Sequence, residues 1–311
     1  MMNDVAPLAP VLGVRRDGSV SASSASDLLI TIFGELMLPG GRSAWTQTLV
    51  ETLGLFDVEA KAARQAISRL SNKGWITPER VGRRSKWSLT PWATSLLQRG
   101  ADRIYAHGEV DRDWDGQWLV LLASVSEQRR TLRPKLNVSL GWAGFGSLGQ
   151  GVWLCPWADR QREATAILSD LDIGDATLFQ STMTDVGNPR ALAERAWELD
   201  ALAVGYRVFL EAFDEPSADA QPDAQPDAQP DAQPDAQPDA QSASRLLDLV
   251  DAWRRFPLQD PSLPAALHDA DWPGDAAAQR FRSLRAHWGP AAARWWAAAN
   301  NSYGEPRSQA G

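Results

Sequence analysis

The chain has 311 residues, enough for two or three domains at about 100–200 residues each, and its 44% hydrophobic and 23% charged residues are typical of a globular protein. The single cysteine, Cys155, excludes an intrachain disulfide and a zinc site of several cysteines. No two of the three histidines have metal-ligand spacing, so no metal is expected. No run of about 18 apolar residues suggests a membrane span, and residues 1–25 lack the apolar core of a secretory signal. We therefore expect a cytoplasmic protein with a flexible tail at 1–25.

The segment after this tail has the pattern of three helices and two short strands. Apolar residues recur at helical spacing in three stretches, with Ser26 and Asp57 as the N-caps of the first and third. Two β-like runs follow, joined by a Gly-Arg-Arg turn. This order is typical of a winged helix-turn-helix, which we assign to residues 26–95. We expect its helices over 26–37, 44–53 and 58–72, and its strands over 75–77 and 86–89.

Basic residues concentrate in the third helix and the ribbon, although the whole chain has a net charge of −8. Residues 59–90 hold eight Lys or Arg against two acidic residues, a local charge of +6 that leaves −14 elsewhere. At about 100° per residue, Ala63 and Ile67 fall on one face of the helix and polar side chains on the other. A solvated surface helix would look the same, but a basic ribbon beside it favours DNA binding. The expected DNA-binding residues are Lys61, Arg64, Gln65, Ser68 and Arg69 of the helix and Arg83, Arg84, Ser85 and Lys86 of the ribbon.

The roles of these residues follow from their expected positions. Arg64, Gln65 and Ser68 lie at or beside the centre of the exposed face, so we assign them to base edges. We place Arg83, Arg84 and Lys86 at the tip of the ribbon, where phosphate contact is expected and insertion into the minor groove is the alternative.

A central unit over residues 110–185 is expected to be a ferredoxin-like α/β sandwich, because its elements alternate as β-α-β-β-α-β. Cys155 lies in an apolar run, which favours a buried structural thiol over a nucleophile. The basic residues of its first helix could contact phosphates of DNA or of a ligand, or form a solvated face. The candidates are Arg129, Arg130 and Arg133. We expect strands over 117–125, within 144–156 and over 176–180, and helices over the stretch around 129–135 and over 162–171.

The remaining residues, 189–300, are expected to form a mostly helical C-terminal domain, which makes the chain an α+β multidomain protein. Its aromatic residues have helical spacing and are expected in the core, although some could line a pocket. An Asp-Ala-Gln-Pro repeat interrupts the domain within 216–243. Proline at every fourth position and the lack of large apolar side chains predict a disordered, solvated linker, whose aspartates have no counter-charge. Partner binding by the repeat is the alternative. The expected helices cover 189–213, 243–256 and 275–299.

Three stretches together resemble the PaaX family, the repressors of phenylacetate catabolism. They read TIFGELMLPGG, then ARQAISRLSNKGWI followed by VGRRSKWSLT, and RRFPLQDPSLPAAL followed by ADWPG. The last is the most specific, because a generic winged-helix protein would not carry it. The resemblance covers about residues 26–297 and implies a homodimeric repressor released by an aryl-CoA thioester, typically phenylacetyl-CoA. The Asp-Ala-Gln-Pro repeat departs from the family pattern.

The central unit also resembles the small CRISPR adaptation proteins that have a metal-dependent nuclease site. In those proteins an aspartate ends the first strand. Here the stretch reads Leu122-Ala123-Ser124-Val125 and offers no carboxylate to a hard cation. We therefore expect a dimerising or scaffolding role for this unit.

The sequence offers no catalytic motif: there is no GxSxG, no P-loop, no GxGxxG after a strand and no paired His/Cys site. We expect a regulator without a cofactor and not an enzyme. One alternative is a repressor or activator of another pathway with a different effector. The other is an aryl-CoA-binding enzyme fused to a DNA-binding domain.

Overall fold

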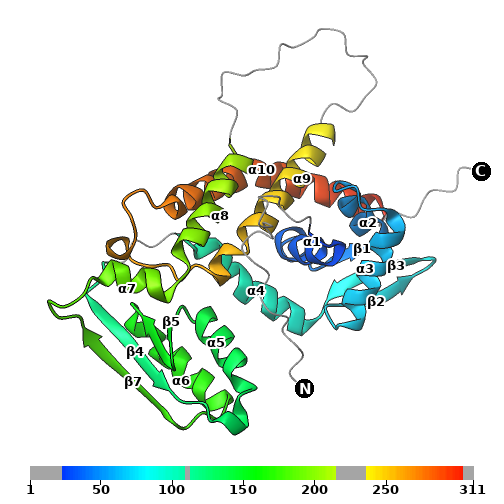
Figure 1. The fold of residues 1–311 in the computed structure, drawn as a ribbon. Helices are drawn as coiled ribbons and strands as arrows, with labels where there is room; N and C mark the ends of the chain where they lie inside the picture. Colours follow the sequence, from blue (N-terminus) through cyan, green and yellow to red (C-terminus); the bar gives the residue numbers. More distant parts are fainter. Residues whose placement is uncertain (1–22, 109–112, 215–235, 304–311) are drawn as a thin grey trace, which may run out of the picture. The chain divides into compact units, whose positions relative to one another are not determined.

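The computed structural model describes residues 23–108, 113–214 and 236–303 (Figure 1). The chain forms two compact units. The first contains the described parts of Ala106–Leu210 and Arg254–Ala278, and the second those of Ala22–Tyr105, Glu211–Trp253 and Gln279–Gly311. Most of the predicted tail and the repeat up to residue 235 lie outside the described residues. Among the helices of the described residues, none combines the length and the hydrophobicity of a membrane span.

The second unit begins with short helices and a small antiparallel sheet of order β1-β3-β2. Leu29, Ile32 and Leu49 of the first two α-helices are fully buried, and Ile67 of the third is 1% exposed. These side chains form the core on which the third helix rests. The elements are α1 (Ala25–Ile32), the π-helix η2 (Phe33–Met37), β1 (Ser43–Trp45), α2 (Thr46–Gly54), α3 (Ala60–Asn72), β2 (Ile76–Val81), β3 (Arg84–Leu89) and α4 (Pro91–Ala106).

Several predicted boundaries in this segment were wrong. The first helix is capped by Ser24, whose hydroxyl accepts the backbone N–H of Asp27 at 3.2 Å, and not by Ser26. Asp57 has a left-handed backbone with φ +57° and is not the N-cap. Helix α3 follows Glu59 and starts at Ala60, two residues later than predicted. Strand β1 and helix α4 were not predicted. Strand β1 has only three residues and exists through its pairing with β3, about 40 residues away along the chain, which no local pattern reveals.

The first unit contains a four-stranded antiparallel sheet of order β5-β6-β4-β7. Along the chain its elements follow the predicted order of strand, helix, two strands, helix and strand. The elements are β4 (Gln117–Ala123), η3 (Glu127–Arg129), α5 (Leu132–Trp142), β5 (Gly146–Gly149), β6 (Val152–Cys155), η4 (Ala158–Arg160), α6 (Gln161–Asp170) and β7 (Ala176–Thr182).

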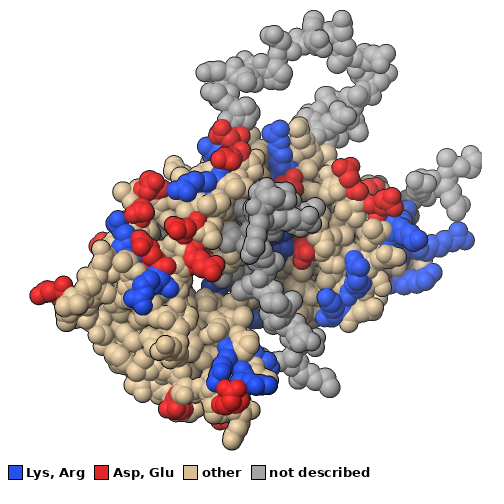
Figure 2. All heavy atoms as spheres, in the orientation of Figure 1, with Lys and Arg blue, Asp and Glu red and all other residues tan. Residues whose placement is uncertain are grey.

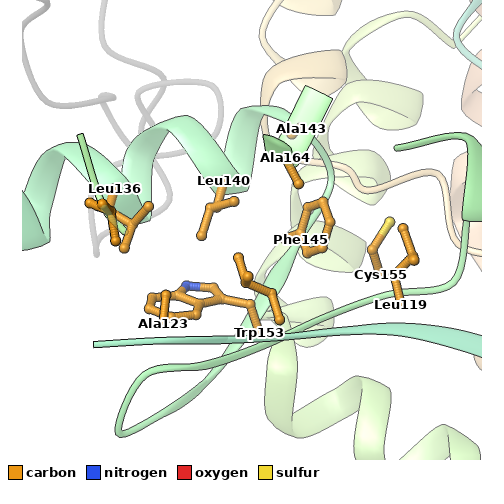
Figure 3. Close-up of a cluster of buried hydrophobic side chains, with 11 residues drawn as sticks. Leu119, Ala123, Leu136, Leu140, Ala143, Phe145, Trp153, Cys155 and Ala164 are labelled. Atoms are coloured by element: carbon orange, nitrogen blue, oxygen red, sulfur yellow. The ribbon is translucent and has the colours of Figure 1, made fainter. Parts of the chain in front are cut away.

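Both faces of this sheet are packed along part of their length. On one face Leu119 and Leu121 of β4 pack with Leu136 and Leu140 of α5 and with Ala164 of α6 (Figure 3). Side chains of the opposite face pack with helical segments further along the chain, and they include Trp118, Leu154, Ala193, Leu199 and Leu267. Because successive side chains of β4 point to opposite faces of the sheet, this strand contributes to two hydrophobic cores.

Helices make up most of the remaining chain, but the single helix predicted over 189–213 was wrong. It breaks at Trp197, whose backbone is extended with φ −130° and ψ 150°. The Trp197 ring stacks on Trp118 with centroids 6.4 Å apart, and this packing overrides the helical pattern. The elements are α7 (Pro189–Ala196), α8 (Leu199–Ala212), α9 (Ala236–Trp253), η5 (Phe256–Leu258), η6 (Ala265–Leu267) and α10 (Pro273–Ser302).

The last residues of the Asp-Ala-Gln-Pro repeat are helical, which corrects the predicted linker. Helix α9 starts at Ala236, and Pro238 is tolerated because it lies in the first turn, where its missing N–H would have no helical acceptor. The carboxylate of Asp239 accepts from Arg294 at 2.9 Å, so this aspartate does have a counter-charge.

Candidate nucleic-acid interface

Helix α3 has one buried and one exposed face, as its sequence predicted. Ala63, Ala66, Ile67 and Leu70 are at most 2% exposed. The small alanines allow α3 to lie close to α1 and α2, which it contacts. The polar residues of α3 predicted for DNA binding are all exposed, and the guanidinium of Arg64 donates to the carbonyl of Ala60 at 3.3 Å. The exposed residues of α3 are Lys61, Arg64, Gln65, Ser68 and Arg69.

The β2–β3 ribbon carries cationic side chains near its tip, where Figure 2 shows Lys and Arg gathered. Val81 pairs with Arg84, which leaves a two-residue turn of Gly82 and Arg83. Gly82 has φ +61°, the left-handed value that the first position of a tight hairpin turn of this kind requires. Arg83 is exposed at the tip, and no hydrogen bond or ion pair involves it among the described residues.

The other ribbon residues predicted to bind DNA make contacts within the protein that the sequence did not predict. Lys86 lies within β3, paired with Trp45 and Glu79, and its Nζ is 5.7 Å from the centre of the Trp45 ring. It is therefore not at the tip, because the strands extend further than predicted. The guanidinium of Arg84 donates to the carbonyl of Tyr303 at 2.5 Å.

Ser85 is half-buried, and its carbonyl accepts from the hydroxyl of Thr46 at 3.1 Å. Arg80, by contrast, is exposed on β2 close to the turn and was not among the predicted residues. Its position within the basic segment 59–90 is the sequence feature that could have identified it as a DNA-binding candidate.

The three arginines of the central unit do not converge on one point. Arg129 donates to the carbonyls of Leu171 and Asp172 at 2.9 and 2.5 Å. Arg130 and Arg133 both lie against the carboxylate of Glu127, at 3.4 and 2.9 Å. Arg133 lines a cavity that opens beside the end of β4.

The described residues contain no cluster of three acidic, histidine or cysteine side chains that could hold a metal ion. Cys155 is fully buried, and burial raises the pKa of its thiol to about 12, in agreement with a structural role.

Known proteins match the chain along most of its length. Sequence models of a PaaX-like protein, of a PaaX central Cas2-like domain and of a PaaX-like C-terminal domain match residues 24–92, 111–193 and 197–298. The transcriptional repressor PaaX of Escherichia coli K12 is 27% identical over 273 residues, covering 86% of this chain and 82% of that protein. The structure of an uncharacterized protein of Mycobacterium tuberculosis superimposes with a TM-score of 0.57 at 20% identity, over 89% of this chain and 98% of that one. The three matches follow one another in the same order along the chain and leave only its ends and short junctions uncovered, so the chain belongs to the PaaX family.

Proposed function

We propose that the chain is a DNA-binding transcriptional repressor whose residues 24–92 act as a winged helix-turn-helix. The observation that carries this proposal is the pairing, in one unit, of the exposed polar face of α3 with the ribbon that ends in Arg83. A helix of this kind enters the major groove while the ribbon contacts the adjacent backbone. Membership of the PaaX family supports a regulator in place of an enzyme.

In this proposal α3 reads bases and the ribbon binds phosphates. Gln65 and Arg64 can each form two hydrogen bonds to a purine, and Ser68 lies one helical turn from them. Lys61 and Arg69 flank this group and suit phosphates. Arg83 replaces Lys86 as the main phosphate contact of the ribbon, because Lys86 packs on Trp45.

The repressor acts as a homodimer in the cytoplasm, with the central unit as a ferredoxin-like sandwich that joins two copies. The order β5-β6-β4-β7 supports this fold. Leu122 and Phe179 are each 42% exposed on the sheet face opposite α5 and α6, and β7 is an edge strand. Exposed apolar side chains beside an open edge favour contact between copies. Two copies would bind half-sites about one helical turn apart, or a multiple of that distance.

The effector is an aryl-CoA such as phenylacetyl-CoA, which binds the DNA-free form more tightly than the bound form. A hundredfold loss of operator affinity needs about 2.7 kcal/mol of coupling, which allosteric proteins attain.

Binding and expression assays test these proposals. The full-length protein is mixed with duplexes from the promoters beside its gene, with and without phenylacetyl-CoA, phenylacetate or CoA. We expect a two-fold complex that phenylacetyl-CoA dissociates, and higher expression of a promoter reporter when the gene is deleted. Lower expression on deletion would indicate an activator, and release by another thioester would indicate another pathway. Turnover of phenylacetyl-CoA by the protein alone would support the enzyme alternative, and failure to bind any promoter duplex would contradict the proposed function.

A further inference from the structure

A cavity of about 430 Å³ opens in the first unit beside the end of strand β4. Its walls come from the residues that end and follow β4, from helix α5 and from the turn between β5 and β6. This volume is near the lower end of small-molecule sites, which span about 300–1,000 Å³. The lining residues are Ala123, Ser124, Val125, Arg133, Leu136, Asn137, Ser147, Gly149, Gln150, Gly151 and Trp153.

The cavity combines polar lining residues with two apolar side chains, Leu136 and Trp153, that are almost fully buried. Leu136 and Trp153 are 1% and 6% exposed and belong to the core between the sheet and α5, where Figure 3 shows them together. The indole N–H of Trp153 has no acceptor among the described residues. This N–H is itself buried in the core, so the donors that a ligand in the cavity can reach are those of the rim.

The turn that forms one wall is held in an uncommon conformation. Gln150 has φ +51°, between two glycines that are also left-handed. A Cβ on Gly151 would lie 2.5 Å from the carbonyl oxygen of Ala123, so the turn approaches the end of β4 as closely as a glycine permits. The backbone N–H of Ala123 donates to the carbonyl of Gly151 at 2.9 Å, which fixes this wall.

The rim of the cavity offers hydrogen-bond donors and a positive charge. The guanidinium of Arg133 is anchored by the carbonyl of Val125 at 3.1 Å and by Glu127 at 2.9 Å, and it keeps further N–H groups for a ligand. Asn137 lies four residues further along α5 on the same side and is exposed. No acidic residue lines the cavity, so the chemistry favours an apolar body with an anionic or carbonyl group.

We propose that this cavity binds the acyl part of the effector, a small apolar group that carries a carbonyl oxygen, either as a free acid or as a thioester. The inference rests on the proposed function and gives it a site. The apolar body lies against Trp153 and Leu136, and the carbonyl oxygen accepts from Arg133 or Asn137 at the rim. The volume holds an acyl group but not a whole coenzyme, so the nucleotide of a thioester extends out past Arg133.

Titration calorimetry on the full-length protein tests the site with three probes: phenylacetyl-CoA, phenylacetate and CoA. Asn137→Trp fills the mouth from an exposed helical position, and Arg133→Leu removes the charge. Lys135→Trp and Arg130→Leu are matched controls on exposed residues that do not line the cavity. Melting temperature and operator binding without a probe check that every variant is folded.

We expect Asn137→Trp to weaken the binding of the acyl-containing probe, phenylacetyl-CoA or phenylacetate, by on the order of tenfold or more. Arg133→Leu should weaken it by several-fold, and both controls should bind as wild type does. Preference for phenylacetate identifies the free acid as the ligand, and preference for phenylacetyl-CoA identifies the thioester. Equal binding of CoA and phenylacetyl-CoA would overturn the proposal, because the acyl group would then not be recognised.

Unchanged binding of phenylacetyl-CoA by Asn137→Trp would place the effector elsewhere and overturn only the cavity assignment. If wild type binds none of the three probes, both the assignment of the cavity and the proposal of an aryl-CoA effector are overturned. The DNA-binding part of the proposed function would then be judged by operator binding alone.

Discussion

Replacement of Arg285 by methionine should destabilise the unit that carries α3, because it leaves a buried carboxylate with one partner. The side chain of Glu35, in η2, is 5% exposed. One carboxylate oxygen accepts from Nε and Nη2 of Arg285, both at 3.1 Å, and the other accepts from the hydroxyl of Tyr105. The Arg285 guanidinium also lies 4.0 Å from the centre of the Tyr105 ring. This cluster joins the N-terminal helices to α4 and α10.

The magnitude follows from the burial of the pair. Removal of one partner of a fully buried ion pair costs about 3–5 kcal/mol. Because Arg285 is 38% exposed and screened by solvent, we expect a smaller cost of about 2–3 kcal/mol. In the double variant Glu35→Gln, Arg285→Met no charge is buried and the amide oxygen can still accept from Tyr105. We expect this variant to lose less than about 1 kcal/mol relative to wild type.

Hydrogen exchange of amides within α1 and η2 measures the change in the full-length protein. Arg285→Met should lower protection about 30- to 150-fold, the equivalent of 2–3 kcal/mol in the free energy of local opening, and the double variant should restore most of it. Gln279→Met, an exposed change in the same helix, is the control. Equal losses in the single and double variants would refute the reasoning, because the charge of Glu35 would then not cause the cost.

Three further predictions concern single features. Burial raises the pKa of Cys155 to about 12, so a thiol reagent at pH 8 should label one thiol per chain only after denaturation. Fast reaction of the folded protein would contradict a buried thiol. Deletion of residues 219–234 should shift the melting temperature by only about 1–2 °C and leave operator affinity unchanged, because loop closure depends weakly on length; a fall of many degrees would show that the repeat packs. Asn300→Ala removes bonds to the N–H of Trp45 and the carbonyl of Ser43, at 3.1 and 3.2 Å, and should cost about 1–3 kcal/mol in urea unfolding. Equal stability of the alanine variant would show that these bonds are not formed in solution.

The features predicted correctly from sequence are those encoded locally. The buried and exposed faces of α3 follow from helical periodicity, and the helix lies where its pattern of small apolar residues indicated. The order of strands and helices in the central unit follows from short apolar runs and the turns between them. The family-specific stretch near the C-terminus was also predicted correctly, because residues 197–298 match a PaaX-like C-terminal domain.

The features missed depend on contacts between distant residues. The carbonyl that binds Arg84 belongs to Tyr303, and the ring beneath Lys86 belongs to Trp45, so no pattern in the ribbon could reveal either. The break at Trp197 depends on stacking with Trp118, 79 positions earlier in the chain. Secondary-structure propensity is a weak prior where such tertiary packing competes.

The central claim, that α3 reads bases while the ribbon binds phosphates, is tested most directly by affinities measured over several salt concentrations. The measurement compares Gln65→Ala and Arg83→Ala with wild type on operator and scrambled duplexes. Gln65→Ala should cost about 1–3 kcal/mol on the operator alone and leave the salt slope unchanged. Arg83→Ala should weaken both duplexes alike and reduce the slope by about one. Equal losses by Gln65→Ala on the two duplexes would contradict the assignment of α3 as the recognition helix.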